Sequence, residues 1–302
     1  MVYKESLNDR LFNIINISLL TLVLLIVAYP LYFVVIASFS NWADVATGNV
    51  ILYPIGISFS GYEMVFEYDE VWIGYRNTIF YSISATLVNL AVSLPAAYAL
   101  SRRDLRWRGF FTVVFMIPMF FSGGLIPYYL LITQTLHWND TIWIMIIPGA
   151  TSFTQLVVAR TFFKSTIPDD LRESAEIDGA SNAMVFFRII LPLSGAIIAV
   201  QALQCAVGNW NSFFNAMIYL SDRQGRNLKT LQLILRTILI MSETQVATAE
   251  KMADQTNYVE RLQRAEQLKY ALIIVSCIPM LVIYPFIQKY FVKGIMIGSL
   301  KE

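Results

Sequence analysis

The chain has 302 residues, of which 57% are hydrophobic and only 14% are charged, and its mean hydropathy is +0.57. Soluble domains carry about a quarter charged residues, so this composition excludes a soluble globular protein and indicates an integral membrane protein. The formal net charge of +1, with no basic stretch interleaved with aromatic residues, excludes a nucleic-acid-binding protein.

The positions of the charged residues predict an all-α membrane protein with six transmembrane helices. Six intervals contain no Asp, Glu, Lys or Arg, and each is long enough for a helix to cross about 30 Å of hydrocarbon. We expect these helices to form a single transmembrane domain over residues 1–302. The predicted spans are 12–38, 77–100, 110–132, 141–159, 189–220 and 270–288.

The distribution of basic residues predicts how the spans are oriented. The loop 101–108 contains four Arg and one Asp, which is typical of a cytoplasmic loop, whereas 41–74 contains no Lys or Arg and is expected outside. Alternation then places the connector 160–188 inside and the loop 221–269 outside, with helix expected in the outer loop over 247–269. The protein is therefore expected to be a multi-pass, lipid-embedded protein of the cytoplasmic (inner) membrane of the cell, with both termini in the cytoplasm.

The sequence offers no residues for catalysis or for cofactor binding. One histidine and two distant cysteines, Cys205 and Cys277, exclude multi-histidine metal sites and zinc ribbons. The nucleotide and hydrolase motifs GxxxxGK[ST], GxGxxG and GxSxG do not occur. We therefore expect a protein that is not an enzyme and has no catalytic, metal or cofactor site.

The predicted spans contain no charged residue, which bears on the source of energy for any transport. Ion-coupled carriers place Asp, Glu, His or Arg within the membrane to bind or relay the coupling ion. Their absence disfavours a self-sufficient secondary carrier, although backbone carbonyls could still hold Na⁺. Any driving force is expected to come from another polypeptide.

The most organised polar stretch lies in the connector, over residues 168–180, with the sequence PDDLRESAEIDGA. Pro168 ends the preceding helix, one of the two aspartates after it can cap a new helix, and Gly179 permits a sharp turn. A second helix is expected to follow and to end at Pro192. This pattern predicts a short helix across the cytoplasmic mouth, and residue chemistry alone leaves open an ordinary connector.

This stretch resembles the EAA loop of ABC importer permeases. The shared spacing is Glu173-x-Ala175-x3-Gly179-x9-Ile189-x-Leu191-Pro192, with Ser174 where the family has Ala. The chain is thus similar to binding-protein-dependent (MetI-like) permeases, to the carbohydrate-uptake MalG-like subunits, and to their LplC/YtcP branch. Further matching segments are Asn77-Thr78, Ala97-Tyr98-Ala99-Leu100-Ser101-Arg102, Trp210-Asn211-x-Phe213 and Val292-Lys293-Gly294.

The resemblance implies a type I ABC importer permease whose cytoplasmic coupling helix docks in a cleft of an ATPase subunit. It also implies a heterodimer with a second, MalF-like permease subunit, two ATPase subunits that hold ATP and Mg, and an extracellular solute-binding protein that delivers a carbohydrate. The coupling residues that it implies are Leu171, Glu173, Ser174, Ala175, Ile177, Asp178, Gly179 and Ala180.

The fifth predicted span is unusually polar. Gln201, Gln204 and Asn211 have the spacing of one helical stripe, and an amide without a partner in hydrocarbon costs several kcal/mol. Amides beside aromatic rings suit neutral sugars, whereas amides also form ordinary hydrogen bonds between transmembrane helices. The residues predicted to line a solute path are Gln201, Gln204, Asn209, Trp210, Asn211, Phe214 and Asn215, together with Tyr128 and Tyr129.

The function predicted from the sequence is thus the transmembrane permease subunit of an ATP-driven importer that translocates an oligosaccharide. Two alternatives remain at this stage. One is a membrane scaffold, or a subunit of another membrane complex, whose cytoplasmic helix binds a soluble partner. The other is an ABC importer for a solute that is not a sugar.

Overall fold

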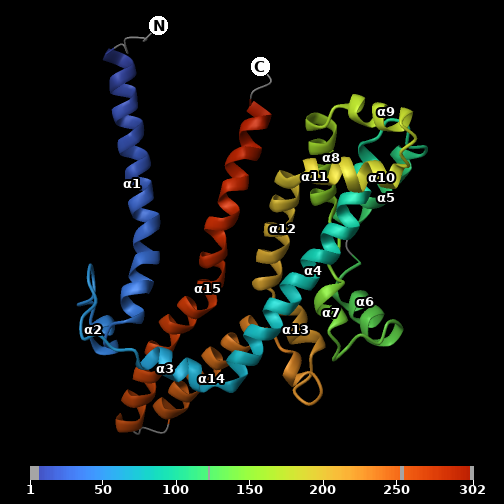
Figure 1. The fold of residues 1–302 in the computed structure, drawn as a ribbon. Coiled ribbons are helices and arrows are strands. Elements are labelled where there is room, and N and C mark those ends of the chain that lie inside the picture. Colours follow the sequence, from blue (N-terminus) through green and yellow to red (C-terminus); the bar gives the residue numbers. More distant parts are fainter. Residues whose placement is uncertain (1–6, 122, 252–254, 300–302) are drawn as a thin grey trace. The chain divides into compact units, whose positions relative to one another are not determined.

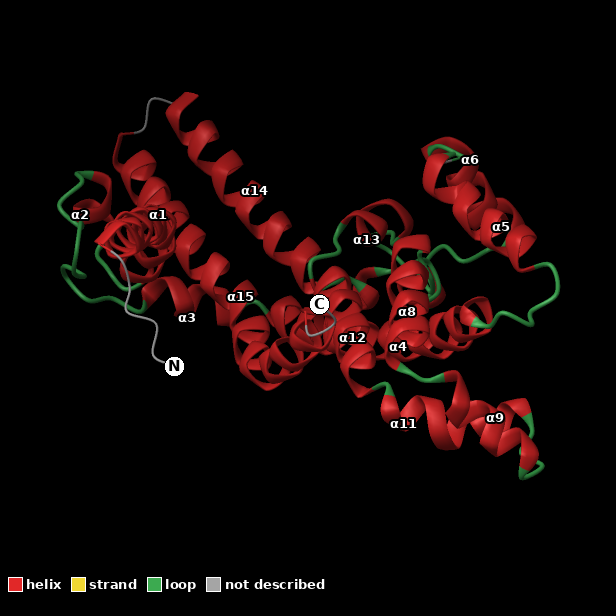
Figure 2. Cartoon of the chain, turned by 90° about the horizontal axis from the view of Figure 1, so that it is seen from above, coloured by secondary structure: helices red, strands yellow, loops and turns green. Residues whose placement is uncertain are grey.

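The computed structural model describes residues 7–121, 123–251 and 255–299. Within these ranges every regular element is a helix, and Figure 2 shows helices joined by loops and turns with no strand among the described residues. This confirms the prediction of an all-α fold. The chain divides into two compact units, Met1–Tyr68 with Leu235–Ile278, and Asp69–Ile234 with Pro279–Glu302.

The first unit is built from helices at both ends of the chain. Its helices are α1 (Leu7–Ser38), α2 (Trp42–Ala46), α3 (Ser60–Glu67) and most of α14 (Leu231–Lys251), with the first part of α15 (Gln255–Ser299). Helix α1 is apolar all round, and only 6% of its most hydrophobic stretch is buried within the chain, so its side chains face the membrane or another chain.

Contacts between α3 and α15 show how the first unit is held together. A methyl group at Gly61 would lie 2.7 Å from the backbone oxygen of Gln267, so only glycine permits this approach. Beside it, the Ser60 hydroxyl donates a hydrogen bond to the Gln267 side chain at 2.9 Å. The end of α1 joins the same assembly because Tyr62 donates to the Ser38 hydroxyl at 2.7 Å.

The second unit contains the long helix α4 (Asp69–Ser101) and all the shorter helices that follow it. In chain order these are α5 (Arg108–Phe120), α6 (Leu125–Leu130), the π-helical η1 (Leu131–Thr135), α7 (Trp143–Ile146), α8 (Phe153–Thr166), α9 (Asp169–Ile177), α10 (Asn182–Val185), the π-helical η2 (Phe186–Ile190), α11 (Leu191–Leu193), α12 (Gly195–Trp210), α13 (Phe214–Tyr219) and the 3-10 turn η3 (Arg226–Leu228).

Helix α4 is the centre of this unit, with α8 and α12 packed along it (Figure 1). A polar network crosses this buried junction: the Asn89 amide donates to the Gln155 side-chain oxygen at 2.8 Å and to the carbonyl of Ala150 at 3.1 Å. Gln201 adds α12 by donating to the Gln155 carbonyl at 2.9 Å. Because each group has a partner, these amides can lie in an apolar environment.

The N-terminal part of α4 binds the segment that leads from α13 into α14. Asn77 donates to the carbonyls of Asn227 and Lys229 at 2.7 and 3.0 Å, and the Thr78 hydroxyl accepts from the Leu231 amide at 2.8 Å. One helical turn on, Tyr81 donates to a carbonyl of the same segment. The Asn77-Thr78 pair therefore satisfies backbone groups that would otherwise be buried without partners.

Three described helices are long and apolar enough to cross a membrane, namely α1, α4 and the part of α15 over Ala265–Pro285. The number rises to five if two bent helix pairs each count as one span. These pairs are Arg108–Phe120 with Leu125–Thr135, bent by 110°, and Asn182–Leu193 with Gly195–Trp210, bent by 80°. The count of six spans stays a prediction. The expected break in the third span is present, and Gly124 there has a φ of +80°.

The fourth and fifth spans were predicted as continuous helices, and the structure corrects both. Span 141–159 is interrupted between α7 and α8, where Gly149 has a φ of +85° after Pro148, and α8 continues to Thr166. Span 189–220 is divided into α11, α12 and α13. The hydrophobic pattern records which residues avoid water, and it does not record where local backbone chemistry interrupts a helix.

Helix also extends beyond the apolar intervals. The segment 221–269 was predicted as a loop with helix only over 247–269, whereas α14 already begins at Leu231. Likewise, α15 is longer than the predicted span 270–288. Charged and amide residues are good helix formers, so a charge marks the end of the apolar stretch and need not mark the end of the helix.

Candidate functional site

Helix α9 forms where the connector pattern predicts a short helix, and its C-terminus is a Schellman cap. The Ala180 amide donates to the Ala175 carbonyl at 2.9 Å, and the Gly179 amide donates to the Glu176 carbonyl at 3.0 Å. Gly179 has a φ of +82°, a conformation in which a side chain is strained. The glycine therefore ends the helix, and no atom lies near enough to contact a methyl group placed there.

The N-terminus of α9 and the helix after it differ from the prediction. The residue before α9 is Pro168, and neither Asp169 nor Asp170 caps the helix, because both lie in its first turn. Their charges still favour the positive end of the helix dipole. The second helix begins after Ser181, whose hydroxyl caps it, and Pro192 lies inside α11 instead of ending the helix.

The two faces of α9 have different environments. Ala175 is 9% exposed and packs into a core cluster with Phe163 and Phe186, while Ile177 is 87% exposed. The predicted coupling residues on the exposed side are Leu171, Glu173, Ser174, Ile177, Asp178 and Gly179.

Two of the predicted coupling residues lie on the buried side of α9. Ala175 packs on the core of its own chain, and its role in coupling stays a prediction. Ala180, which is half-buried, packs against the same cluster. The reason is helical periodicity: a nine-residue helix packed on a core turns one stripe inward and leaves the other outward.

A cluster of four charged groups joins α9 to the end of α4. Arg102 donates to both carboxylate oxygens of Asp104 and lies 3.6 Å from Glu176, while Arg172 lies 3.1 Å from Glu176 and 3.7 Å from Asp104. The hydrogen bond from Arg102 lowers the pKa of Asp104 to about 2 and, in turn, raises the pKa of Arg102. Arg102 and Asp104 are therefore expected to stay charged at cellular pH.

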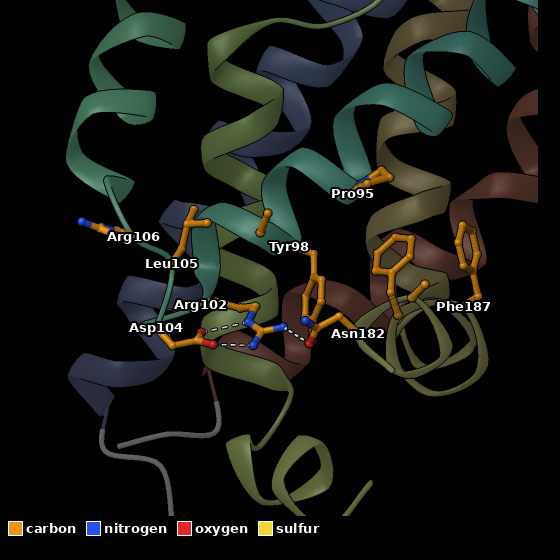
Figure 3. Close-up of a pocket in the computed structure, with 11 residues that line it drawn as sticks. Pro95, Tyr98, Arg102, Asp104, Leu105, Arg106, Asn182 and Phe187 are labelled. Carbon is orange, nitrogen blue, oxygen red and sulfur yellow. Dashed lines mark hydrogen bonds and ion pairs between the residues drawn. The ribbon is translucent and has the colours of Figure 1, made fainter. Parts of the chain in front are cut away.

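Next to this cluster is a cavity of about 480 Å³. Figure 3 shows the Arg102 guanidinium between Asp104 and Asn182, with Pro95 and Phe187 on other parts of the lining. The lining is mainly apolar and comes from α4, the loop after it, α10 and η2. Its residues are Pro95, Tyr98, Ala99, Arg102, Asp104, Leu105, Arg106, Asn182, Ala183, Phe186 and Phe187.

The predicted stripe on the fifth span is divided by the structure. Gln201 is 1% exposed and bonded to α8, and its side-chain oxygen accepts from Ser93 on α4 at 3.2 Å. Trp210 is 2% exposed, with its ring 6.1 Å from that of Tyr75. These two residues were predicted to line a path. Here they lie in the interior and hold α12 on its neighbours.

The other residues of the fifth span predicted to line the path lie on α12, at its C-terminal end and on α13. Gln204, Asn211 and Phe214 are exposed and Asn215 is half-buried. No hydrogen bond within the described chain involves the side chains of Gln204 or Asn211. Asn209 differs, since its amide donates to the carbonyl of Cys205 at 2.9 Å and is satisfied within its own helix.

Tyr128 and Tyr129 lie on α6, in a separate place from this stripe. Their rings pack on Tyr219 of α13, at centroid distances of 6.4 and 5.8 Å. Both side chains are partly exposed, with 37% and 42% of their surface accessible. The structure thus brings the tyrosines together with α13, whereas Gln204 lies on α12 and Asn211 directly follows that helix.

The charged cluster is the part of the site that sequence reasoning missed. The loop 101–108 indicated orientation only, and its pairing with α9 depends on contacts between residues far apart in the chain, such as Arg102 and Glu176. One local signal was present, because Arg172 and Glu176 have the i, i+4 spacing of a helical ion pair. Nothing in the sequence pointed to Asn182 as a partner of Arg102.

Comparison with known proteins gives consistent matches over nearly the whole chain. Residues 72–297 match the family described as binding-protein-dependent transport system inner membrane component. The chain is 35% identical to the polygalacturonan/rhamnogalacturonan transport system permease protein YtcP of Bacillus subtilis (strain 168), covering 98% of this chain and 100% of that protein. It is 34% identical to Protein LplC of the same organism, covering 97% and 95%.

A solved structure is similar to this fold at a TM-score of 0.82 and 31% sequence identity, covering 96% of this chain and 100% of that one. It belongs to a bacterial ABC transporter involved in the import of the acidic polysaccharide alginate. The family match covers more than half of the chain, and the full-length relatives agree with it. The protein is therefore a permease of the family of binding-protein-dependent transport system inner membrane components.

Proposed function

We propose that this permease is one of two transmembrane subunits of an ATP-driven importer of oligosaccharides. In this assembly α9 docks on an ATPase subunit, ATP and Mg are held by two such ATPase subunits, and an extracellular binding protein delivers the solute. The relatives support the solute class: one is named for polygalacturonan and rhamnogalacturonan transport, another for arabinooligosaccharides, and the alginate importer has the same fold.

The observation that carries the proposal is the exposed side of α9. Ile177 is 87% exposed and Leu171 is 39% exposed, on a short helix whose opposite side is fixed in the core. Large apolar side chains exposed next to a carboxylate, here Glu173, are typical of a surface that binds another protein. Because α9 is packed on a core that includes residues of α4 and α8, a displacement of α9 by a bound protein can be transmitted to these two helices.

The solute path is proposed to follow the open side of α12. Gln204 and Asn211 have amides without a partner in the described chain, and in a membrane such groups must face protein or water. Phe214, the first residue of α13, is also exposed. Amides that donate and accept hydrogen bonds, together with an aromatic ring, suit the hydroxyl groups and C–H faces of sugars.

The test of the docking surface compares two exposed apolar residues of the same connector. Ile177→Glu places a charge on the exposed side of α9, whereas Met184→Glu places it on α10, where Met184 is 43% exposed. We expect Ile177→Glu to abolish co-purification of the ATPase subunits and Met184→Glu to retain it. Retention of the ATPase by both variants would exclude α9 as the docking element.

The test of the function uses the purified wild-type complex in vesicles with its binding protein. ATP hydrolysis is measured against a panel of neutral and acidic oligosaccharides, with amino acids and short peptides as the comparison set. We expect stimulation, and accumulation of solute in the vesicles, only with oligosaccharides. Stimulation by a peptide or amino acid alone would overturn the solute class and leave the importer assignment standing.

A further inference from the structure

Arg102 is the first residue after α4, and its guanidinium group contacts three separate segments. It bonds to Asp104 in the following loop, with Nε to Oδ1 at 2.9 Å, and Nη1 donates to Oδ1 of Asn182 on α10 at 2.5 Å. Nη2 lies 3.6 Å from Oε1 of Glu176 on α9. Figure 3 shows the first two of these contacts on opposite sides of the guanidinium group.

The cluster is closed by Arg172 and is electrically balanced. Two cations, Arg102 and Arg172, lie among two carboxylates, Asp104 and Glu176. The cationic side chains are 15% and 20% exposed and the carboxylates 52% and 40%. The cations are therefore the sheltered members, so their geometry is fixed by protein more than by water.

Beside the cavity, α4 and η2 are in direct apolar contact, since the ring centroids of Tyr98 and Phe186 lie 5.4 Å apart. The cavity of about 480 Å³ leaves another part of the space between α4, α10 and η2 unfilled. Apolar contacts are also non-directional, so they permit helices to slide past each other. The planar guanidinium fork, with five donors in fixed directions, sets one orientation instead.

From this geometry we propose that Arg102 is the positioning residue that transmits movement of α9 to the transmembrane helix α4. The inference rests on the proposed function, in which α9 receives the movement of an ATPase subunit. Arg102 touches neither solute nor nucleotide. It acts through Glu176 and Asn182, which lie on the helices before and after the Gly179 turn, so that both move with the end of α4.

The neighbouring arginine supplies a matched control. Arg103 is in the same loop and has the same charge, and it is exposed and forms no ion pair or hydrogen bond in the described chain. Arg102→Gln removes the charged fork, Arg102→Lys keeps the charge without the fork, and Arg103→Gln removes a charge without touching the cluster. The three variants separate directional bonding from local positive charge.

The experiment uses the complete importer, reconstituted in vesicles with its ATPase subunits and binding protein. The readout is the ratio of oligosaccharide transported to ATP hydrolysed. We expect Arg102→Gln to lower this ratio about tenfold, within the usual range of coupling effects between sites. ATP hydrolysis and co-purification of the ATPase should continue, Arg102→Lys should not restore the ratio, and Arg103→Gln should match wild type.

Two results would overturn the inference: an unchanged ratio in Arg102→Gln, or an equal loss in Arg103→Gln. If Arg102→Gln does not assemble, Glu176→Gln and Asn182→Ala each remove one contact of the fork, and wild-type ratios in both would likewise overturn it. Failure of the wild-type complex to transport any oligosaccharide would instead count against the proposed function, so the two failures are distinguishable.

Discussion

Amide side chains of one residue type have different roles on α12. Gln201 lies in the interior with donors and acceptors matched on α4 and α8, while Gln204, three residues further on, lies on the open side. Three residues on a helix correspond to about 300° of rotation, so the two side chains lie only about 60° apart and the edge of the core falls between them. The position relative to the core decides whether an amide joins helices or is exposed and available to line the proposed path.

This difference predicts that substitution by Leu lowers stability at position 201 and weakens transport at position 204. Gln201→Leu removes the hydrogen bond to the Gln155 carbonyl and should lower the stability of the purified complex by about 1 kcal/mol. Gln204→Leu should leave stability unchanged and weaken oligosaccharide transport, because it removes an amide from the path. Thermal unfolding and transport KM, measured on both variants, check the two effects. A transport defect without loss of stability in Gln201→Leu would contradict the assignment.

At the scale of elements, α9 owes its position to its two ends and to its inner stripe. Ala175 seats it on the core, the Arg102 cluster ties it to α4, and the Schellman cap ends it at Gly179. The cap requires a left-handed backbone at one residue only, and glycine adopts it without strain. Gly179 thus acts through the shape of the turn, because no neighbouring atom lies close to it.

The cap predicts that the loss of coupling on substitution of Gly179 depends on how well the new residue tolerates a positive φ. Asn tolerates a positive φ and should retain most coupling between ATP hydrolysis and transport. Val is β-branched and should cost about 1–3 kcal/mol locally, so that α9 frays and coupling falls. The transport-to-hydrolysis ratio of the two variants measures this difference. Equal defects in both would indicate that Gly179 is needed for close contact with another protein and not for the turn.

At the scale of the whole molecule, the predicted orientation places the loop 101–108 and α9 on the cytoplasmic side and the segment that follows α13 outside. The described cluster of Arg102 with α9 agrees with the first part, since both belong to one side of the second unit. The N-terminal part of α4, at Asn77, bonds the segment after α13, so these two also share a side.

Cysteine labelling tests this orientation. Arg103→Cys and Arg223→Cys are both exposed positions in the described chain, one in each of the two regions. In intact cells a membrane-impermeant maleimide should label Arg223→Cys and spare Arg103→Cys, and permeabilised cells should label both. The parent chain, with Cys205 and Cys277 in apolar segments, gives the background. Labelling of Arg103→Cys in intact cells would reverse the predicted topology.

Local patterns in the sequence were sufficient to predict the chemical character of the elements. The charge-free intervals predicted a helical membrane protein, because hydrocarbon excludes charge regardless of how the helices pack. The pattern from Pro168 to Gly179 predicted α9, since a helix start, a run of helix formers and a glycine stop act within a few residues. The spacing of the same segment was also enough to indicate the permease family, which the comparisons confirm.

The tertiary structure alone decided which face of each helix is covered. It turned Ala175 and Gln201 inward and left Ile177 and Gln204 outward, and it brought Arg102 to α9 across a long stretch of chain. The physical reason is that burial and ion pairing depend on distance in space, whereas helix formation and hydrophobicity depend on neighbours in the chain. A single sequence specifies the neighbours in the chain directly, and the neighbours in space appear only when the helices are packed.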